Sequence, residues 1–280
     1  MSFPNFEGKH AGRPYVTARL LLEYRESLGD AASEVPRAVV LTWQRDLESR
    51  VRASRDHQEV HGAGVGSLLR LTPGLGLARS PVGAPVAAIV VEELSARGTE
   101  LFIGVGTAGA INDRLAAGDL VVCSAALRDE GTSHHYAPPE ALAVPDPDLT
   151  HRLRTTLPTA AVGPSWTTDA PYRETAEEIA KYRADGIFTV EMEASCLFTV
   201  ARTVGSAAAA AFVVSDVLHG EEWEPHFGSA DVSQGLWTLF EAAEACLSSL
   251  ATSRAGRTGR PPKGSSCCSR APRHTSCRRA

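Results

Sequence analysis

Two acidic residues on either side of a methionine are the most chemically suggestive feature of this sequence. Glu191 and Glu193 flank Met192 where a β-branched run changes into a helical pattern. A third acid, Asp216, follows Ser215 at the end of a long apolar run. Carboxylates in a pocket can bind hydroxyl groups or transfer protons, so these acids indicate chemistry on a polar small molecule.

A glycine-rich run at residues 104–109 matches the G-x-G-x-x-G pattern of dinucleotide-binding folds, and Asp129 mimics their ribose-binding acid. Only residues 110–118 separate this run from the next apolar segment, which leaves no room for the helix whose amino terminus would bind the phosphates. We therefore do not expect a dinucleotide. The glycines would instead let backbone N–H groups and the Thr107 hydroxyl approach an anion or a sugar, or would form a tight turn between buried strands.

Segments of strand and helix character alternate along the chain. Alternation of this kind predicts an α/β fold: a single domain with a mixed central β-sheet, helices on both faces and a ligand site at the carboxyl ends of the strands. The expected strands are 37–43, 66–71, 100–105, 119–127 and 207–214. The expected helices are 86–96, 148–157, 175–184, 192–204 and 233–253.

Composition divides the chain into an N-terminal helical arm (1–35), a catalytic domain (36–253) and a basic tail (254–280). Residues 245–280 contain eight basic and no acidic residues, which leaves 20 basic against 33 acidic residues in the rest of the chain. Nucleic acid is not expected as a partner, because such affinity comes largely from neutralising phosphates. The tail is rich in Gly, Pro, Ser and Arg, and we expect it to be disordered.

Neither a membrane span nor a metal centre is expected. The amino terminus lacks a signal-peptide pattern, and no apolar run reaches the roughly eighteen residues of a membrane span. Cys123, Cys196 and Cys246 lie in apolar segments as small core residues. His134 and His135 are adjacent and therefore poorly placed to bind one metal ion. We expect a cytoplasmic protein with reduced thiols and no cofactor.

Four segments resemble the nucleoside phosphorylase superfamily, which includes purine nucleoside phosphorylases, uridine phosphorylases and methylthioadenosine/adenosylhomocysteine nucleosidases. They are Phe-Ile-Gly-Val-Gly-Thr-Ala-Gly-Ala-Ile at 102–111, Gly-Asp-Leu-Val-Val at 118–122, Val-Glu-Met-Glu-Ala at 190–194 and Val-Ser-Asp at 214–216. Their order and spacing carry the resemblance over residues 36–250. It implies a homo-oligomer that cleaves the N-glycosidic bond of a nucleoside.

The resemblance also implies which residues bind the sugar and the acceptor. Glu193 would accept hydrogen bonds from the ribose hydroxyls, Met192 would pack against the sugar, and Glu191 would lie beside them. Gly106 and Thr107 would touch the acceptor, with Thr107 also near the ribose. Hydroxyls held by a carboxylate would favour the positive charge that develops on the sugar as the bond breaks.

The base would lie against Ser215 and Asp216, and a buried Asp216 that carries a proton would neutralise the leaving base. Uridine-type members have an arginine where Asp216 stands, so we expect a purine-type nucleoside, with a pyrimidine as the alternative. The segment after Asp216, which contains Trp223, would close over the pocket. The remaining base-binding candidates are Thr168, Asp169, Tyr172 and Arg173.

The residues that would bind phosphate depart from the family pattern. Family phosphorylases carry an arginine where this chain has Gly104, and their Gly-Asp-Pro-x-Arg-like turn is replaced by Leu-Thr-Trp-Gln-Arg-Asp at 41–46. Losing guanidinium contacts weakens the binding of a dianion. We expect phosphate as the acceptor and co-substrate, with Arg128, Arg79 or a neighbouring subunit supplying the charge. Water as acceptor, as in the nucleosidases, and a non-catalytic nucleoside-binding role are the alternatives.

Overall fold

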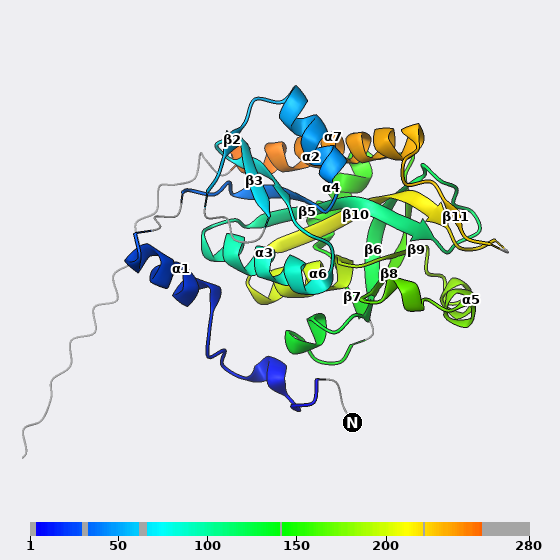
Figure 1. The fold of residues 1–280 in the computed structure, drawn as a ribbon, viewed down its shortest axis with the longest axis horizontal. Helices are drawn as coiled ribbons and strands as arrows, with labels where there is room; N and C mark the ends of the chain where they lie inside the picture. Colours follow the sequence, from blue (N-terminus) through cyan, green and yellow to red (C-terminus); the bar gives the residue numbers. More distant parts are fainter. Residues whose placement is uncertain (1–3, 30–32, 62–65, 141, 221, 254–280) are drawn as a thin grey trace, which may run out of the picture.

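The computed structural model describes residues 4–29, 33–61, 66–140, 142–220 and 222–253. The predicted tail lies outside these residues. Figure 1 shows a central sheet with helices on both sides. Parallel and antiparallel strand pairs both occur in the sheet. The predicted α/β fold with a mixed sheet in one domain is therefore confirmed.

Strand β5 (Leu101–Ala110) lies at the centre of the sheet. It pairs in parallel with β10 (Ala207–Val217) along its whole length and with β1 (Ala38–Thr42) over its first half. The long apolar run of β10 is buried on both faces, as a central parallel strand requires. Beyond β1 the sheet continues through β4 (Leu75–Arg79), β3 (Ser67–Thr72) and β2 (Gln58–Glu59).

On its other side β10 pairs with β6 (Leu120–Asp129), which is antiparallel to it. β6 pairs with β8 (Ala161–Thr168), and β8 pairs with the short strand β9 (Thr189–Glu191). β9 returns to β5, so β5, β10, β6, β8 and β9 close into a ring. Two further short strands, β7 (Leu142–Ala143) and β11 (Glu224–Pro225), pair with β6 and β10.

One edge of β5 changes partner halfway along the strand. Val105 pairs with Thr42 of β1, and Gly109 pairs with Val190 of β9, whereas no described strand pairs with that edge at residues 106–108. The sheet therefore splits between β1 and β9. Ligand sites of α/β sheets form at points where neighbouring strands part in this way.

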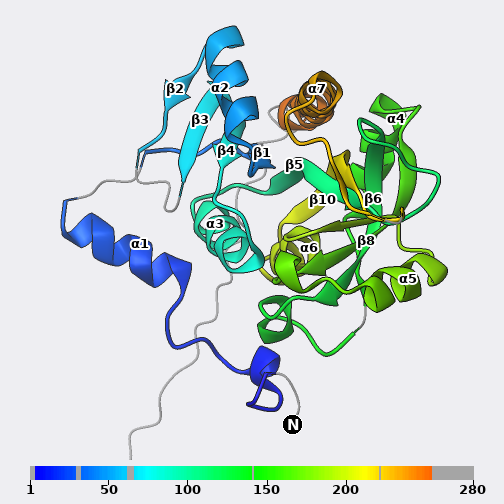
Figure 2. The ribbon, with the colours of Figure 1, turned by 45° about the vertical axis from the view of Figure 1, so that its right-hand side comes forward.

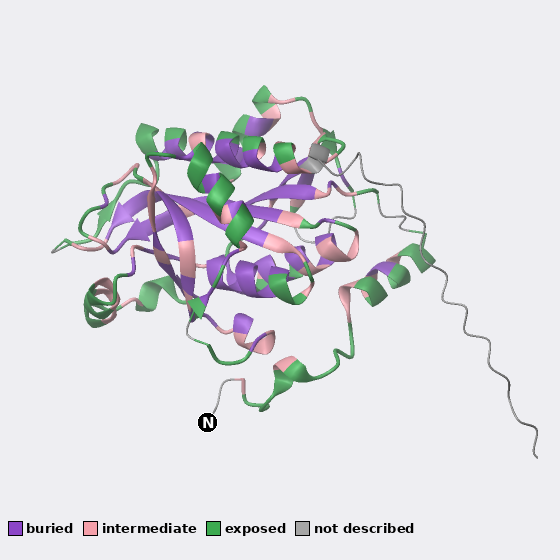
Figure 3. Cartoon of the chain, turned by 180° about the vertical axis from the view of Figure 1, so that it is seen from behind, coloured by how far each residue is buried: buried purple, intermediate pink, exposed green. Residues whose placement is uncertain are grey.

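The strands supply two large hydrophobic cores, one on each face of the sheet. In β1, Ala38 and Val40 face one core while Val39 and Leu41 face the other, because side chains alternate along a strand. Helices α3 (Ala84–Ala96) and α6 (Ala194–Thr203) cover one face (Figure 1). The other face is covered by α2 (Arg45–Ser54), α4 (Pro147–Thr156) and α7 (Ala230–Ser253). In Figure 3 the strands between these layers are almost entirely buried.

Two helices lie at the periphery. Helix α1 (Ala18–Ser27), in the predicted N-terminal arm, lies on the outer side of α3 (Figure 2). Arg25 of α1 forms an ion pair with Glu93 of α3 at 3.4 Å. Leu22 is the buried residue of α1. Helix α5 (Ala176–Ala184) lies near β8, where Tyr182 packs on Trp166. The 3-10 helices are η1 (Lys9–Ala11), η2 (Ser133–His135) and η3 (Pro171–Arg173).

The structure differs from the sequence-based elements in three respects. The glycine run at 104–109 lies inside β5 and not in a turn, because β10 pairs with it to its end. The predicted helix at 192–204 begins only at Ala194. Helix α2 and strands β4 and β8 were not predicted. Residues 111–119 between β5 and β6 contain no helix, as expected. Within the described chain, no helix is both long and apolar enough to span a membrane.

Candidate functional site

A cavity of about 570 Å³ lies in the split between β1 and β9. Two other hollows, of about 400 and about 660 Å³, lie beside Asp56 and His57 and contain none of the candidate residues. The cavity in the split therefore holds the candidate site. Its lining residues are Trp43, Gln44, Val82, Thr107, Ala108, Gly109, Pro171, Tyr172, Glu174, Ile179, Val190, Glu191, Met192, Glu193, Ser215, Asp216, Leu218, Trp223 and Phe227.

Glu193 lies in the cavity wall at the N-cap position of α6 and is only 5% exposed. Its Oε1 accepts a hydrogen bond from the Gly83 backbone N–H at 2.6 Å. Burial, and then the charge of Glu191, raises the pKa of Glu193 to about 8. Met192, beside it, is partly exposed to the cavity. The predicted sugar-binding pair thus faces the cavity.

Glu191 also lines the cavity, but its carboxylate is engaged within the protein. Oε2 accepts hydrogen bonds from the backbone N–H groups of Glu193 and Ala194 at 2.7 and 2.6 Å, and Oε1 accepts one from the Thr167 hydroxyl at 2.5 Å. Burial raises the pKa of Glu191, and these hydrogen bonds act against that rise. Glu191 therefore satisfies the first N–H groups of α6 and so fixes the position of Glu193.

Asp216 reaches the cavity through a β-bulge. Val214 pairs with Ala108 and Asp216 with Gly109, so Ser215 is the extra residue in β10. The Ser215 hydroxyl donates to Asp216 Oδ1 at 2.8 Å, and the Trp223 indole N–H donates to Oδ2 at 2.9 Å. Asp216 is 9% exposed. Trp223 and Phe227 line the cavity, as expected of the segment after Asp216.

Thr107 lies on the free edge of β5, in the same cavity. Its hydroxyl accepts a hydrogen bond from the Gln44 side-chain amide at 3.1 Å. Gln44 is the N-cap residue of α2, and no side-chain hydrogen bond caps that helix. Thr107, Gln44 and the start of α2 therefore form one end of the site.

Gly106 was predicted to touch the acceptor, and the structure corrects this. Gly106 is absent from the cavity lining, because the indole of Trp43 covers it: a Cβ at Gly106 would lie 3.1 Å from Trp43 Cε3. A Cβ at Gly104 would lie 2.9 Å from Leu197 Cδ2 and 3.2 Å from Trp43 Cη2. The two glycines make room for a tryptophan ring, and the same ring occupies the space that a family arginine at position 104 would need.

Arg128, the other predicted acceptor residue, is not brought to the cavity. Its guanidinium donates to the Ser133 hydroxyl at 2.9 Å and to the Pro138 carbonyl at 2.6 Å, and so anchors the loop after β6. A buried guanidinium needs acceptors nearby, and this loop supplies them. Arg79, also considered for phosphate, is paired with Glu48.

The segment after β8 lines the cavity, but mostly with residues that were not predicted to do so. Thr168 accepts from the Ala170 N–H at 3.2 Å, Asp169 accepts from the Gly131 N–H at 2.7 Å, and Arg173 is exposed. None of the three lines the cavity, whereas Tyr172 does. The predicted segment is therefore near the site, but three of its four candidate side chains point elsewhere.

Sequence reasoning missed Glu174, which lines the cavity from this segment. Burial raises the pKa of Glu174 to about 7, with further contributions from the charges of Asp216 and Glu178. Its only sequence signal is its place directly before Thr175, which begins α5 with a capping box.

The charged residues that line the cavity are all acids: Glu174, Glu191, Glu193 and Asp216. Among the described residues, no group of three or more His, Cys, Asp or Glu side chains is arranged to hold a metal ion. The cavity therefore suits a neutral or cationic ligand that donates hydrogen bonds.

Known proteins share both the sequence pattern and the fold. A guanosine phosphorylase from Halorubrum lacusprofundi is 40% identical over 137 residues, which cover 46% of this chain and 55% of that protein. A uridine phosphorylase from Thermococcus kodakarensis is 33% identical over 144 residues, which cover 44% and 51%. The matched part spans about half the length of these curated relatives.

Solved structures are similar over most of the chain. A purine nucleoside phosphorylase from Toxoplasma gondii gives a TM-score of 0.70 at 19% identity, covering 78% of this chain and 92% of that one. An AMP nucleosidase from Bacteroides thetaiotaomicron gives 0.65 at 20% identity, covering 82% and 98%. At these identities the likeness establishes the fold. The model of the phosphorylase superfamily matches residues 47–246, and this chain is therefore a member of the phosphorylase superfamily.

Proposed function

We propose that the protein cleaves the N-glycosidic bond of a purine-type nucleoside and transfers the sugar to phosphate. One observation carries this proposal: Thr107, the neighbouring pair Met192 and Glu193, and Asp216, from three segments far apart in the sequence, line a single cavity. The family supplies the reaction, since each of these residues matches a motif position of nucleoside phosphorylases.

The ribose is proposed to lie against Met192 and Glu193. Glu193 accepts backbone hydrogen bonds from Gly83 and Met192, and its two carboxylate oxygens have further lone pairs that can accept from the sugar hydroxyls. An ionised Glu193 would strengthen these bonds as positive charge develops on the sugar, because the buried site screens charge weakly. Thr107 would contact the sugar or the acceptor from the opposite wall.

The base is proposed to lie between Asp216 and the aromatic side chains of Tyr172, Trp223 and Phe227. Acidic side chains at this end suit a base that presents N–H donors. The guanosine phosphorylase is 40% identical and the uridine phosphorylase from Thermococcus kodakarensis 33% identical, which supports a purine without excluding a pyrimidine.

Phosphate as acceptor rests on the named phosphorylases among the relatives. The start of α2, next to Thr107, would offer backbone N–H groups, and Arg45 is the first residue of that helix. An arginine from a second copy would add charge, and we propose a homo-oligomer for this reason. Purine salvage in the cytoplasm is the setting that such a reaction would serve.

Hydrolysis is the second candidate function. The cavity lining of this chain contains no Lys, Arg or His among its described residues, and the Trp43 ring covers the position of the family arginine. A neutral acceptor such as water needs no cation. The fold of the AMP nucleosidase is also compatible with it.

The test is release of free base by the full chain from inosine, guanosine, adenosine and uridine, with and without phosphate. We expect phosphate-dependent release from the purine nucleosides. Glu193→Ala should lower kcat/KM by about two orders of magnitude or more, because transition-state contacts are lost. Glu177→Ala, an exposed change on α5, should behave as wild type.

Each other outcome has a defined meaning in the same assay. Release without phosphate would establish the hydrolytic function, and release from uridine alone would overturn the purine assignment. Nucleoside binding without any release of base would show a non-catalytic protein.

A further inference from the structure

Glu174 is an acid of the cavity whose carboxyl group makes no hydrogen bond or ion pair with any part of the chain that the structure describes. It stands between η3 and α5, and its side chain is half-buried in the wall that also holds Asp216. Its oxygen atoms are not fully buried, so water in the cavity can solvate them. A carboxyl group that has no partner in the protein and faces an open cavity is suited to meet a ligand.

Asp216 differs from Glu174 in its hydrogen bonds. One of its oxygens accepts from the Ser215 hydroxyl, and the other accepts from the Trp223 indole N–H. An indole N–H can only donate, so this contact uses Asp216 as an acceptor. Both oxygens of Asp216 therefore accept hydrogen bonds from the protein. Neither oxygen of Glu174 does so within the described residues.

The surroundings of Glu174 favour a proton on its carboxyl group. It faces Asp216 on β10 and Glu178 on α5, and Glu191 and Glu193 line the same cavity. The basic residue next to it in sequence, Arg173, is exposed. Burial, and then the charges of Asp216 and Glu178, raise the pKa of Glu174 to about 7. A general acid works best when its pKa lies near the operating pH.

We propose that Glu174 is the general acid that protonates the leaving base, with Asp216 as the hydrogen-bonded carboxylate beside it. The inference deepens the proposed function and rests on it. As the C1′–N9 bond breaks, its electron pair passes to the purine. The Glu174 proton goes to ring nitrogen N7, so the base leaves neutral. An oxygen of hydrogen phosphate bonds to C1′, and the proton that the phosphate loses restores Glu174 through solvent.

The experiment compares wild type, Glu174→Gln and the matched control Glu177→Gln on inosine and on 7-methylguanosine with phosphate. The base of 7-methylguanosine already carries positive charge at its imidazole ring and leaves without protonation at N7. The kcat/KM of each variant is measured from about pH 5 to about pH 9. Thermal unfolding confirms that each variant is folded.

On inosine, Glu174→Gln should lower kcat/KM by about 10²–10⁴-fold. On 7-methylguanosine the loss should stay below about tenfold, because that substrate does not need the proton. Wild type should lose activity on inosine as the pH rises through about 7, where Glu174 loses its proton. Glu174→Gln should lack this alkaline limb, and Glu177→Gln should match wild type on both substrates.

Two results overturn the inference while leaving the proposed function intact. One is a Glu174→Gln variant that keeps wild-type activity and pH dependence on inosine. The other is an equal loss on both substrates, which would mean that Glu174 only shapes the cavity. If wild type releases no base from either nucleoside, the proposed function fails and the inference fails with it.

Discussion

At the scale of the residue, the candidate site depends on carboxyl groups held in unfavourable surroundings. Glu193 is nearly fully buried, and its partners are the backbone N–H groups of Gly83 and Met192 and the like charge of Glu191. Such a carboxyl group destabilises the unliganded protein once it ionises. The arrangement is useful for catalysis, because a bound sugar supplies the hydroxyl donors that the protein withholds.

Glu193→Gln is expected to stabilise the unliganded protein and to reduce its activity. The pKa of Glu193 is about 8 in the folded protein against 4.5 for an unperturbed glutamate, so the folded state binds the extra proton between these values. Wild-type stability should therefore fall as the pH rises from 4.5 to 8, and glutamine should remove this loss. The variant's advantage should grow by about 4 kcal/mol over that window, at about 1.4 kcal/mol per pH unit.

Chemical unfolding at a series of pH values checks this prediction. A base-release assay on the same samples should show that Glu193→Gln lowers kcat/KM by about a hundredfold or more. A stability difference that stays constant with pH would mean that folding does not raise the pKa of Glu193. The assay on the same samples separates that result from a loss of fold.

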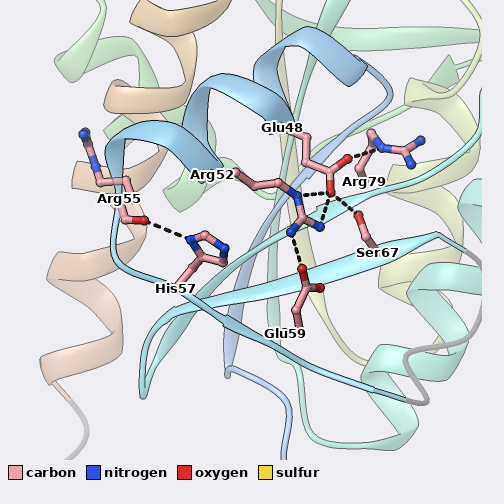
Figure 4. Close-up of polar contacts among 7 residues, drawn as sticks. All are labelled: Glu48, Arg52, Arg55, His57, Glu59, Ser67 and Arg79. Atoms are coloured by element: carbon pink, nitrogen blue, oxygen red, sulfur yellow. Dashed lines mark hydrogen bonds and ion pairs between the residues drawn. The ribbon is translucent and has the colours of Figure 1, made fainter.

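At the scale of the element, polar contacts place helices at the cavity. Glu191 caps α6 and sets Glu193, while a cluster around Glu48 fixes α2 on β3 and β4 (Figure 4). Glu48 accepts hydrogen bonds from Arg52 at 2.7 Å and from the Ser67 hydroxyl at 2.6 Å, and it also pairs with Arg79. The start of α2 borders the cavity, so this cluster holds one of its walls in place.

Glu48→Gln is expected to destabilise the protein. Burial alone would raise the pKa of Glu48, but the hydrogen bonds from Ser67, Arg52 and Arg79 lower it overall. The substitution should cost about 2–3 kcal/mol, since both arginines still reach solvent. A lowered pKa contributes stability above 4.5 that is lost as the pH falls through the folded value.

Urea unfolding at neutral pH and at acid pH measures this difference, with Glu59→Gln as the control. Glu59 is an exposed partner of Arg52 in the same cluster and should change stability by less than about 1 kcal/mol. Equal losses for Glu48→Gln and Glu59→Gln would contradict a central role for Glu48.

At the scale of the whole molecule, ring closure and the split sheet create the site. The ring of β5, β10, β6, β8 and β9 leaves β1 to pair with only half of β5, and the cavity fills the gap. Every lining residue lies between Trp43 and Phe227. The N-terminal arm adds α1, which has one buried residue and lies beside α3.

A chain reduced to residues 36–253, the predicted catalytic domain, is therefore expected to fold and to keep its activity. Its kcat/KM should stay within about twofold of the full chain, because no group that contacts substrate is removed. Loss of the α1 packing should lower Tm by a few degrees, roughly. Circular dichroism and the base-release assay check both points. A folded but inactive truncated chain would show that the arm takes part in the site.

The sequence alone determined where most strands and helices lie, because the pattern of apolar and polar residues that marks each element is contained within a short segment of the chain. The apolar runs of β1, β3, β5, β6 and β10, most of the helices, the absence of a helix between β5 and β6 and the family resemblance were readable from residue order. So were Glu193, Met192, Thr107 and Asp216, which occupy motif positions. Helix α2 escaped prediction because its apolar residues, Leu47 and Val51, are few among charged ones.

Only the tertiary structure decided which side chains share the cavity. The glycines of β5 were expected to approach an anion or a sugar or to form a tight turn, whereas Gly104 and Gly106 accommodate the ring of Trp43 from another strand end. Arg128 donates hydrogen bonds to the loop after β6 and not to the cavity. Glu174, which directly precedes α5, lies close enough to Asp216 of β10 for their charges to interact. Such contacts join residues that are distant in the chain. Packing and strand pairing set them, and neither leaves a periodic signal in the residue order.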